Sequence, residues 1–240
     1  MKAYDRWHSP RLNEPIGLAR WGHYGTPVLV FPTAGGDAEE IERHGVVEAC
    51  QHLIDAGQVK LYSCDSVAGK AMTSKAGSVE WRMWLLNHFF DAVREEVLPA
   101  IWTDCGAELP VVCAGASIGA FNSVAMLCRS PDLVRAALGM SGSYHIEQFH
   151  EGGWSSDLYF ASPLEFLSGL EGPTLDRLRT RYAILATGAG AWEDPGESWA
   201  MAHALGSRGV PNRVDDWGPD FEHDWGTWRR MLPQYLAELT

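Results

Sequence analysis

Ser117 stands between two glycines in the stretch Gly115-Ala116-Ser117-Ile118-Gly119. A run of β-formers, VVCAGA (111–116), precedes this serine, and a helix-like segment, FNSVAMLC (121–128), follows it. A serine in a tight turn between a buried strand and a helix exposes its oxygen, and the next backbone N–H points at a developing oxyanion. Flanking glycines fit this turn because a Cβ at either position would crowd it. The pattern predicts that Ser117 is a nucleophile, and small-residue packing is the alternative.

A serine nucleophile needs a base, and nine histidines are available in this chain. Where the serine occupies such a turn, the chain order is serine, acid, histidine, and the base follows the last strand. NRVDDW (212–217) is the predicted last strand, and GPDFEHDWG (218–226) is the loop after it. His223 in that loop is therefore the predicted base, and an exposed loop histidine without a catalytic role is the alternative.

The acid that orients the histidine should follow the preceding strand, YAILAT (182–187). Two adjacent carboxylates, Glu193 and Asp194, lie in the loop after this strand. Either could orient the imidazole and stabilise its cation, and either could instead cap the helix that follows Pro195. We expect one of them to be catalytic and the other to be a cap. Weaker candidates for the acid are Asp215, Asp216 and Asp224.

An oxyanion hole requires a second donor besides the N–H of Ile118, and the loop after the first buried strand usually supplies it. Here that loop is FPTAGGD (31–37), whose small residues allow the backbone to approach a ligand closely. We predict that the second donor is the N–H of Ala34, with Gly35 as the next candidate. An ordinary glycine turn is the alternative.

Short apolar runs bounded by turn residues recur along the chain. They are mostly continuous rather than alternating, which is typical of strands buried on both faces. Helix-like segments lie between them, so the sequence predicts a mostly parallel sheet with helices on both faces. YDRWHS (4–9) and GLARWGHY (17–24) could form an antiparallel hairpin at the sheet edge. The predicted strands cover 27–31, 59–63, 110–115, 136–141, 182–187 and 212–217.

Three helices are clearest in the pattern. The first begins near Ser78, carries an apolar residue at every fourth position from Trp81, and should end near Pro99. The others cover 199–209 and the stretch TWRRMLPQYLAEL (227–239). No repeat or linker divides the chain, so we expect one domain over residues 1–240. Residues 144–181 are long for a plain connection and are expected to form a small cap over the site.

Composition restricts the function further. The 240 residues are 46% hydrophobic and carry a net charge of −12, which disfavours nucleic acid and anionic membranes as partners. The five cysteines show no CxxC spacing, and the first ten residues contain no apolar segment typical of a secretory leader. These features predict reduced thiols and a cytoplasmic location. Neither an HExxH motif nor a P-loop is present, so we expect no metal and no cofactor.

Several segments of this chain resemble the esterase branch of the α/β-hydrolases, which contains S-formylglutathione hydrolases, feruloyl esterases and mycolyltransferases. The likeness covers most of the chain, and its most specific part is the His-Asp-Trp near the C-terminus. It implies the α/β-hydrolase fold and a triad of Ser117, His223 and an acid at 192–194. Of the two carboxylates we favour Glu193, because Asp194 directly precedes a proline. The segments that carry the resemblance are VLVFPTAGG (28–36), GASIGAFNSV (115–124), SGSYHI (141–146), ATGAGAWEDPGES (186–198) and NRVDDWGPDFEHDWGTWRRMLP (212–233).

The resemblance implies a carboxylic-ester hydrolase that forms a covalent acyl-enzyme on a small acyl or aryl ester. An acyltransferase would use the same triad, and a catalytically silent member would bind a ligand or partner instead. Trp192 and Trp225 are the candidate substrate contacts, and Trp217 and Trp228 lie near the predicted acid and base as well. These four indoles could form the walls of an apolar pocket, or they could belong to the core.

Overall fold

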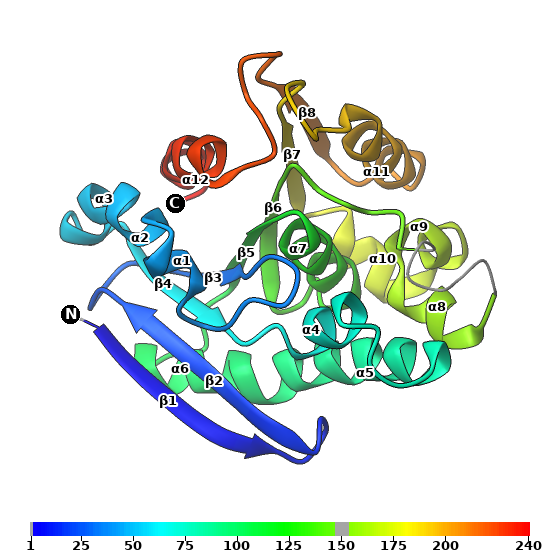
Figure 1. Ribbon diagram of the computed structural model, residues 1–240, viewed down its shortest axis with the longest axis horizontal. Helices are drawn as coiled ribbons and strands as arrows, with labels where there is room; N and C mark the ends of the chain where they lie inside the picture. The colour runs from blue at the N-terminus through cyan, green and yellow to red at the C-terminus, as the bar shows by residue number, and fades with distance from the viewer. Residues whose placement is uncertain (1, 147–153) are drawn as a thin grey trace.

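A computed structural model describes residues 2–146 and 154–240. Within these residues, strands form a single eight-stranded sheet in the order β1-β2-β4-β3-β5-β6-β7-β8 (Figure 1). The pairs β1–β2 and β2–β4 are antiparallel, and all other neighbours are parallel. The strands are β1 (Lys2–Ser9), β2 (Glu14–Trp21), β3 (Thr26–Phe31), β4 (Val59–Cys64), β5 (Val111–Ala116), β6 (Val134–Met140), β7 (Tyr182–Thr187) and β8 (Asn212–Asp216).

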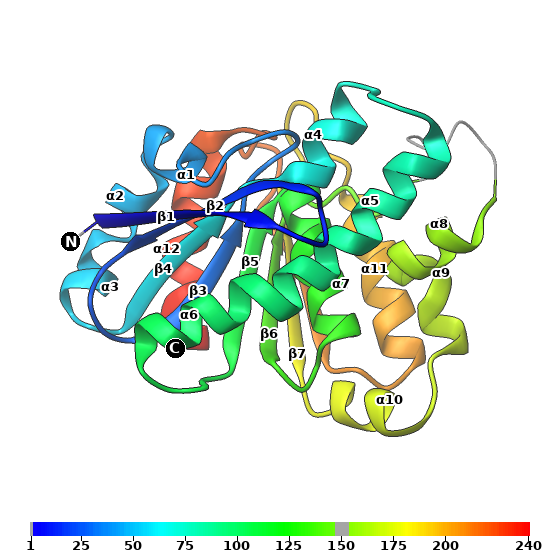
Figure 2. The same ribbon diagram turned by 90° about the horizontal axis from the view of Figure 1, so that it is seen from below.

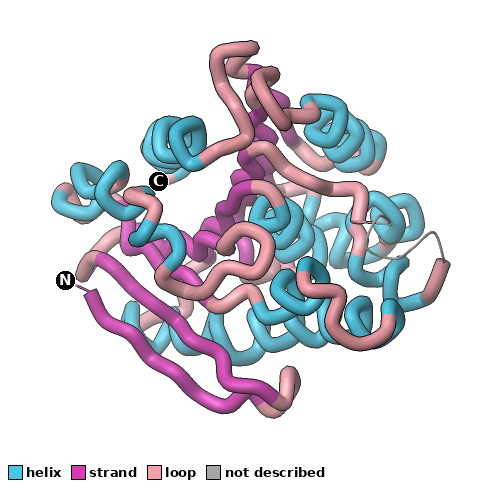
Figure 3. Tube along the Cα trace, in the orientation of Figure 1, coloured by secondary structure: helices cyan, strands magenta, loops and turns pink. Residues whose placement is uncertain are grey.

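Helices cover both faces of this sheet, as the continuous apolar strands predict (Figure 3). In β3, Leu29 and Phe31 pack into the core under α4 to α11, whereas Val28 and Val30 pack into the core under α1 to α3 and α12. The helical segments are α1 (Glu40–Arg43), α2 (Val46–Ala49), α3 (Gln51–Asp55), α4 (Val67–Thr73), α5 (Val79–Ala92), η1 (Val93–Val97), α6 (Leu98–Cys105), α7 (Ile118–Arg129), α8 (Ser156–Ala161), α9 (Pro163–Phe166), η3 (Leu167–Gly169), α10 (Gly172–Leu178), α11 (Pro195–Ser207) and α12 (Trp225–Leu239).

The six predicted strands and the edge hairpin are all confirmed, although β8 is a half-exposed edge strand rather than a buried one. The helix that begins after Ser78 is longer than predicted. Ser78 caps it, since its side chain accepts the amide of Trp81 at 3.2 Å. The helix does not end near Pro99. A π-helical segment, η1, precedes that proline and accommodates its ring and missing N–H, so α6 continues to Cys105. Trp81 is 38% exposed, so the buried stripe of this helix begins one turn later.

The segment expected to form a cap is partly described. Its helices α8, α9 and α10 pack against α5, α11 and α7, beside the helical layer on one face of the sheet (Figure 2). Residues 147–153 lie outside the described residues. That this segment caps the site stays a prediction.

All five cysteines are unpaired, and four of them are buried in the core. Burial raises the pKa of the Cys50 thiol to about 12, so it stays protonated and unreactive at neutral pH. Among the described helices, none is both long and apolar enough to span a membrane.

Candidate active site

Ser117 occupies the turn between β5 and α7, with φ 56° and ψ −122°. This left-handed backbone is uncommon for a residue with a side chain and is typical of a constrained functional position. A Cβ on Gly115 would lie 2.3 Å from the carbonyl carbon of Gly119, and one on Gly119 would lie 2.5 Å from the carbonyl oxygen of Phe31. Both glycines are therefore required by close backbone packing, as the sequence pattern predicts. The amide of Ser117 donates to Met140 at 3.0 Å, which fixes the turn against β6.

His223 lies in the loop between β8 and α12. Its backbone N–H donates to the carbonyl of Ala191 at 3.0 Å, which places it beside the loop that follows β7. The side chain is 24% exposed, and its ring meets the Trp228 ring edge-on at a centroid distance of 5.1 Å. The imidazole is thus partly buried at the carboxyl edge of the sheet, on the same edge as Ser117.

Of the two adjacent carboxylates, Glu193 faces His223. The side chain of Glu193 is 1% exposed, and its Oε2 lies 3.8 Å from Nδ1 of His223. This separation is within the range of an ion pair but is longer than a hydrogen bond, and such contacts often tighten only when substrate is bound. The other oxygen, Oε1, accepts a hydrogen bond from Oγ of Ser141 at 2.5 Å.

A chain of hydrogen bonds holds Glu193 in this orientation. Nε1 of Trp228 donates to Oγ of Ser141 at 2.9 Å, and that hydroxyl donates onward to the carboxylate. Oγ1 of Thr187 lies 3.4 Å from Oε2 of the same carboxylate. In the sequence, Ser141 ends the predicted strand 136–141 and begins SGSYHI (141–146), and neither feature marks it as a partner of Glu193. Its φ is 49°, which is uncommon for a residue with a side chain.

The remaining carboxylates have other partners. Asp194 caps α11 and Asp224 caps α12, each by accepting an amide of the first turn at 2.9 Å. Asp215 pairs with Arg213 at 3.0 Å, and Asp216 accepts an amide in the turn after β8. Glu193 is therefore the carboxylate that the structure brings to His223. Within residues 2–146 and 154–240, no three His, Cys, Asp or Glu side chains gather in a way that could hold a metal ion.

The loops that carry Glu193 and His223 are joined through their backbones. Gly190 donates to the carbonyl of Phe221 at 2.9 Å, and Ala189 donates to the carbonyl of Gly218 at 2.9 Å. A Cβ on Gly188 would lie 2.1 Å from the carbonyl oxygen of Phe221. The glycines of GAGAWE (188–193) thus allow one loop to lie directly against the other.

The predicted oxyanion loop, residues 31–37, follows β3, which is the sheet neighbour of β5. Among the described residues, the amides of Ala34, Gly35 and Ile118 donate to no protein acceptor, so all three are available to a ligand. Neighbouring amides have partners: Gly36 donates to the carbonyl of Thr33 at 3.0 Å. Both candidate amides therefore lack a protein acceptor, and the role of Ala34 or Gly35 in an oxyanion hole stays a prediction.

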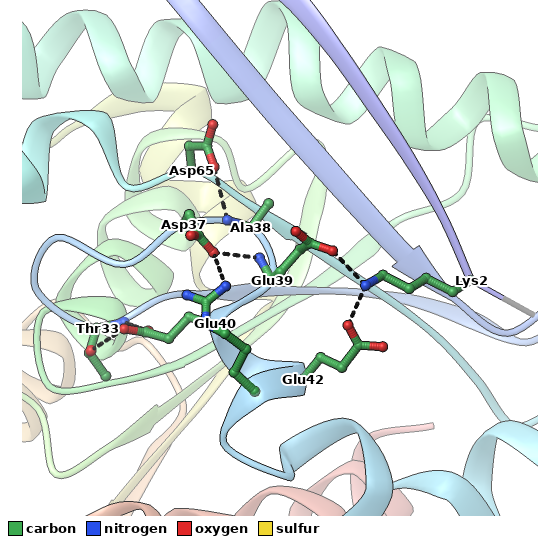
Figure 4. Close-up of polar contacts among 9 residues, drawn as sticks. Lys2, Thr33, Asp37, Ala38, Glu39, Glu40, Glu42 and Asp65 are labelled. Carbon is green, nitrogen blue, oxygen red and sulfur yellow. Dashed lines mark hydrogen bonds and ion pairs between the residues drawn. The ribbon is translucent and has the colours of Figure 1, made fainter.

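The side chain of Glu40 holds the start of this loop through two hydrogen bonds to Thr33. Its carboxylate accepts the amide of Thr33 at 2.7 Å and the hydroxyl of the same residue at 3.0 Å (Figure 4). Burial raises the pKa of the Glu40 carboxyl, with the two hydrogen bonds acting in the opposite direction. Nothing in the local sequence marks Glu40 as part of the site, because its role depends on the turn that brings α1 back under the loop.

The tryptophans near the site have different surroundings. Trp192 is 92% exposed and forms no wall in the described structure. Trp225 stacks on His44 at a centroid distance of 4.2 Å and, with Trp228, borders a cavity of about 10 Å³ behind the turn of Ser117. That cavity has room for about one water molecule and not for a substrate. Trp217 donates from its indole to the hydroxyl of Tyr235 at 2.7 Å, and Tyr235 lies two turns after Trp228 on the same face of α12.

No family model and no curated protein matches the sequence. Solved structures do match. A ferulic acid esterase superimposes with a TM-score of 0.76 at 16% identity, covering 100% of this chain and 98% of that one. An S-formylglutathione hydrolase from Agrobacterium tumefaciens gives 0.74 at 12% identity, with coverage of 99% and 94%. MPT51 (FbpC1) from Mycobacterium tuberculosis gives 0.71 at 17% identity, with coverage of 99% and 97%.

The superpositions cover essentially the whole length of this chain and of the three matched chains. The chain therefore has the α/β-hydrolase fold, as the sequence predicts. Its structural neighbours are named as esterases and their relatives, which agrees with the resemblance found in the sequence. At these identities the comparison establishes the fold, and function has to be argued from the site.

Proposed function

We propose that this protein is a serine carboxylic-ester hydrolase that acts through Ser117, His223 and Glu193. The observation that carries the proposal is the backbone of Ser117, whose φ of 56° is held by glycines that no larger residue could replace. Strain of this kind persists where the surrounding structure enforces it, and in this fold it presents the serine oxygen to substrate.

The contact between His223 and Glu193 supports different roles for the two nitrogens of His223. Nδ1 faces the buried carboxylate of Glu193, which leaves Nε2 to accept the proton of the Ser117 hydroxyl. The serine oxygen attacks the ester carbonyl, and the oxyanion receives the N–H of Ile118 and one amide of the loop after β3. The attack forms a tetrahedral intermediate. Its collapse releases the alcohol, which takes the proton from His223, and leaves the acyl group on Ser117. Water then attacks the acyl-serine by the same route and releases the acid.

The substrate in this proposal is a small acyl or aryl ester, in keeping with the names of the structural neighbours, which include a ferulic acid esterase. An acyltransferase would share every step up to the acyl-enzyme and would differ only in the acceptor. Incubation with p-nitrophenyl acetate and added methanol separates the two: we expect acetate as the main product, whereas mainly methyl acetate would identify a transferase.

The test of the proposal is turnover of p-nitrophenyl acetate by the wild-type protein and by Ser117→Ala. Loss of the nucleophile should lower kcat by about 10⁶-fold, as in well-studied serine hydrolases. Circular dichroism should show an unchanged fold, since the Ser117 hydroxyl has no hydrogen-bond partner among the described residues. Turnover that survives in Ser117→Ala would refute the assignment of the nucleophile.

A further inference from the structure

Ser66 is a helix N-cap whose hydroxyl does not cap its own helix. It precedes α4, yet its side chain accepts no amide of the first turn. The hydroxyl instead donates to the carbonyl oxygen of Ala34 at 3.0 Å, and Ser66 is 1% exposed. Serine at this position normally satisfies an amide of its helix, so the hydroxyl is used here for the oxyanion loop rather than for α4.

Gly69 provides the space for this contact. A Cβ on Gly69 would lie 2.0 Å from the carbonyl oxygen of Ala34 and 2.3 Å from Oγ of Ser66. Glycine inside a helix costs about 0.5–1 kcal/mol relative to alanine. Its presence in the middle of α4 therefore fits a close approach between this helix and the loop.

The hydrogen bond from Ser66 to the Ala34 carbonyl also fixes the direction of the next amide, that of Gly35. A peptide unit is planar and trans, so the C=O of Ala34 and the N–H of Gly35 point in opposite directions. Ser66 follows β4 and Ser117 follows β5, and these strands flank β3 on opposite sides in the sheet. A carbonyl that points from the β3 loop toward Ser66 thus turns the N–H of Gly35 toward the side of the loop on which Ser117 lies.

Other hydrogen bonds hold the rest of the loop after β3, whereas the Ala34–Gly35 peptide is held by Ser66. The amide of Ser66 donates to the carbonyl of Gly36 at 3.0 Å. Asp65 accepts the amide of Ala38 at 2.9 Å, at the far end of the loop (Figure 4). The carbonyl of Ala34 has the Ser66 hydroxyl as its only protein donor among the described residues.

We propose that Ser66 is a positioning residue that orients the Ala34–Gly35 peptide, so that the N–H of Gly35 serves as the second oxyanion donor. The inference rests on the proposed ester hydrolysis and names the residue that sets the geometry of its oxyanion hole. The hydrogen bond from Gly36 to Thr33 closes the turn around this peptide but does not fix which way the peptide faces. Without the Ser66 hydroxyl the peptide can flip within the turn, and a donor that is only sometimes aligned stabilises the transition state less.

The test is steady-state hydrolysis of p-nitrophenyl acetate by Ser66→Ala. We expect kcat to fall by about 10- to 100-fold, which is less than the loss on deleting a whole donor, with KM changed by less than about threefold. Ser123→Ala is the matched control. The Ser123 hydroxyl is also fully buried and donates to a backbone carbonyl, that of Cys113 at 2.9 Å, but it does not touch the loop. Its removal should lower the melting temperature while kcat stays at the wild-type value.

A fall in kcat no larger for Ser66→Ala than for Ser123→Ala would overturn the inference while leaving the ester hydrolase intact. If Ser66→Ala does not fold, Gly69→Ala takes its place, because its methyl would displace both the Ala34 carbonyl and the Ser66 hydroxyl and so break the same hydrogen bond. The same loss of kcat is then expected, and wild-type kcat would overturn the inference. A wild-type protein without turnover would refute the proposed function itself, which distinguishes the two failures.

Discussion

The turn of Ser117 and the pair Glu193–His223 lie on the same edge of the sheet but are built differently. Five consecutive residues form the turn, and contact between two glycine backbones and the β3 loop fixes it. The acid and base come from two different loops. The Ser141 hydroxyl, just after β6, donates to the carboxylate of Glu193, and the indole of Trp228 on α12 donates to that hydroxyl. A catalytic position can thus be enforced by local sterics or assembled from distant polar contacts.

This difference predicts how each region responds to mutation. A turn fixed by backbone packing fails when a single methyl group is added, whereas a pair held by several hydrogen bonds weakens as each bond is removed. The substitutions below are ordered by the size of the expected effect.

His223→Ala should have the largest effect in the acid–base region. Nucleophile and base act as a unit, so kcat should fall to within about tenfold of the Ser117→Ala value. Stopped-flow or long-time hydrolysis of p-nitrophenyl acetate measures both variants. His203→Ala is the control, because His203 is exposed on α11 and should leave kcat unchanged. If His223→Ala retains a tenth of wild-type kcat, the base lies elsewhere.

Glu193→Gln should have the next largest effect. The amide can no longer stabilise the imidazolium, and in a comparable serine enzyme this change of acid lowers kcat by about 10⁴-fold. Asp194→Asn is the matched control: Asn caps a helix as well as Asp does, and Asp194 is turned toward α11, so kcat should hardly change. The reverse pattern would assign the role of the acid to Asp194.

Gly119→Ala and Gly188→Ala compare the two regions directly. In each case the new Cβ would lie 2.5 Å or less from a carbonyl oxygen, that of Phe31 or of Phe221. Overpacking of this kind costs about 1–3 kcal/mol in free energy of unfolding. Gly206→Ala is the control, because its nearest neighbour would be 3.7 Å away, and it should stabilise α11 by about 0.5–1 kcal/mol. Urea unfolding measures the free energy of unfolding of all three variants. An unchanged value for Gly188→Ala would mean that the loops carrying Glu193 and His223 separate easily.

The smallest effect is expected for Asp194→Ala. Loss of the cap on α11 should lower the free energy of unfolding by about 0.5–2 kcal/mol. Thermal unfolding measures the loss, and Ser207→Ala, at the other end of the same helix, provides a comparison with no cap to lose. A loss of kcat beyond tenfold in Asp194→Ala would contradict its role as a cap.

The same contrast explains what the sequence could predict. Ser117 and its glycines are adjacent in sequence, so the strand, the turn and the reason for the glycines were all predictable. Chain order led to His223 and to the pair of carboxylates, and the proline after Asp194 favoured Glu193. The structure shows what the sequence could not, namely that Glu193 faces His223 while Asp194 accepts an amide of α11.

The supporting residues could not be found from the sequence. Ser141 is 52 residues from Glu193, and Trp228 is 87 residues from Ser141. Ser66 is 32 residues from Ala34, and its position before a helix suggests a cap. Trp192 is near the acid in sequence, and its exposed indole rules out a place in the core, whereas its contact with substrate stays a prediction. The prediction that the helix ends near Pro99 was wrong, because the π-helical segment η1 accommodates the proline and the chain stays helical to Cys105.

The most direct test of the catalytic assignment is covalent labelling with a fluorophosphonate, followed by peptide mass spectrometry. A nucleophile activated by His223 should react within minutes, and the phosphonate should be found on Ser117 in the peptide that contains residues 115–119. The label should be absent from Ser117→Ala and strongly reduced in His223→Ala. A label on any other serine, or none on a folded wild-type protein, would contradict the account.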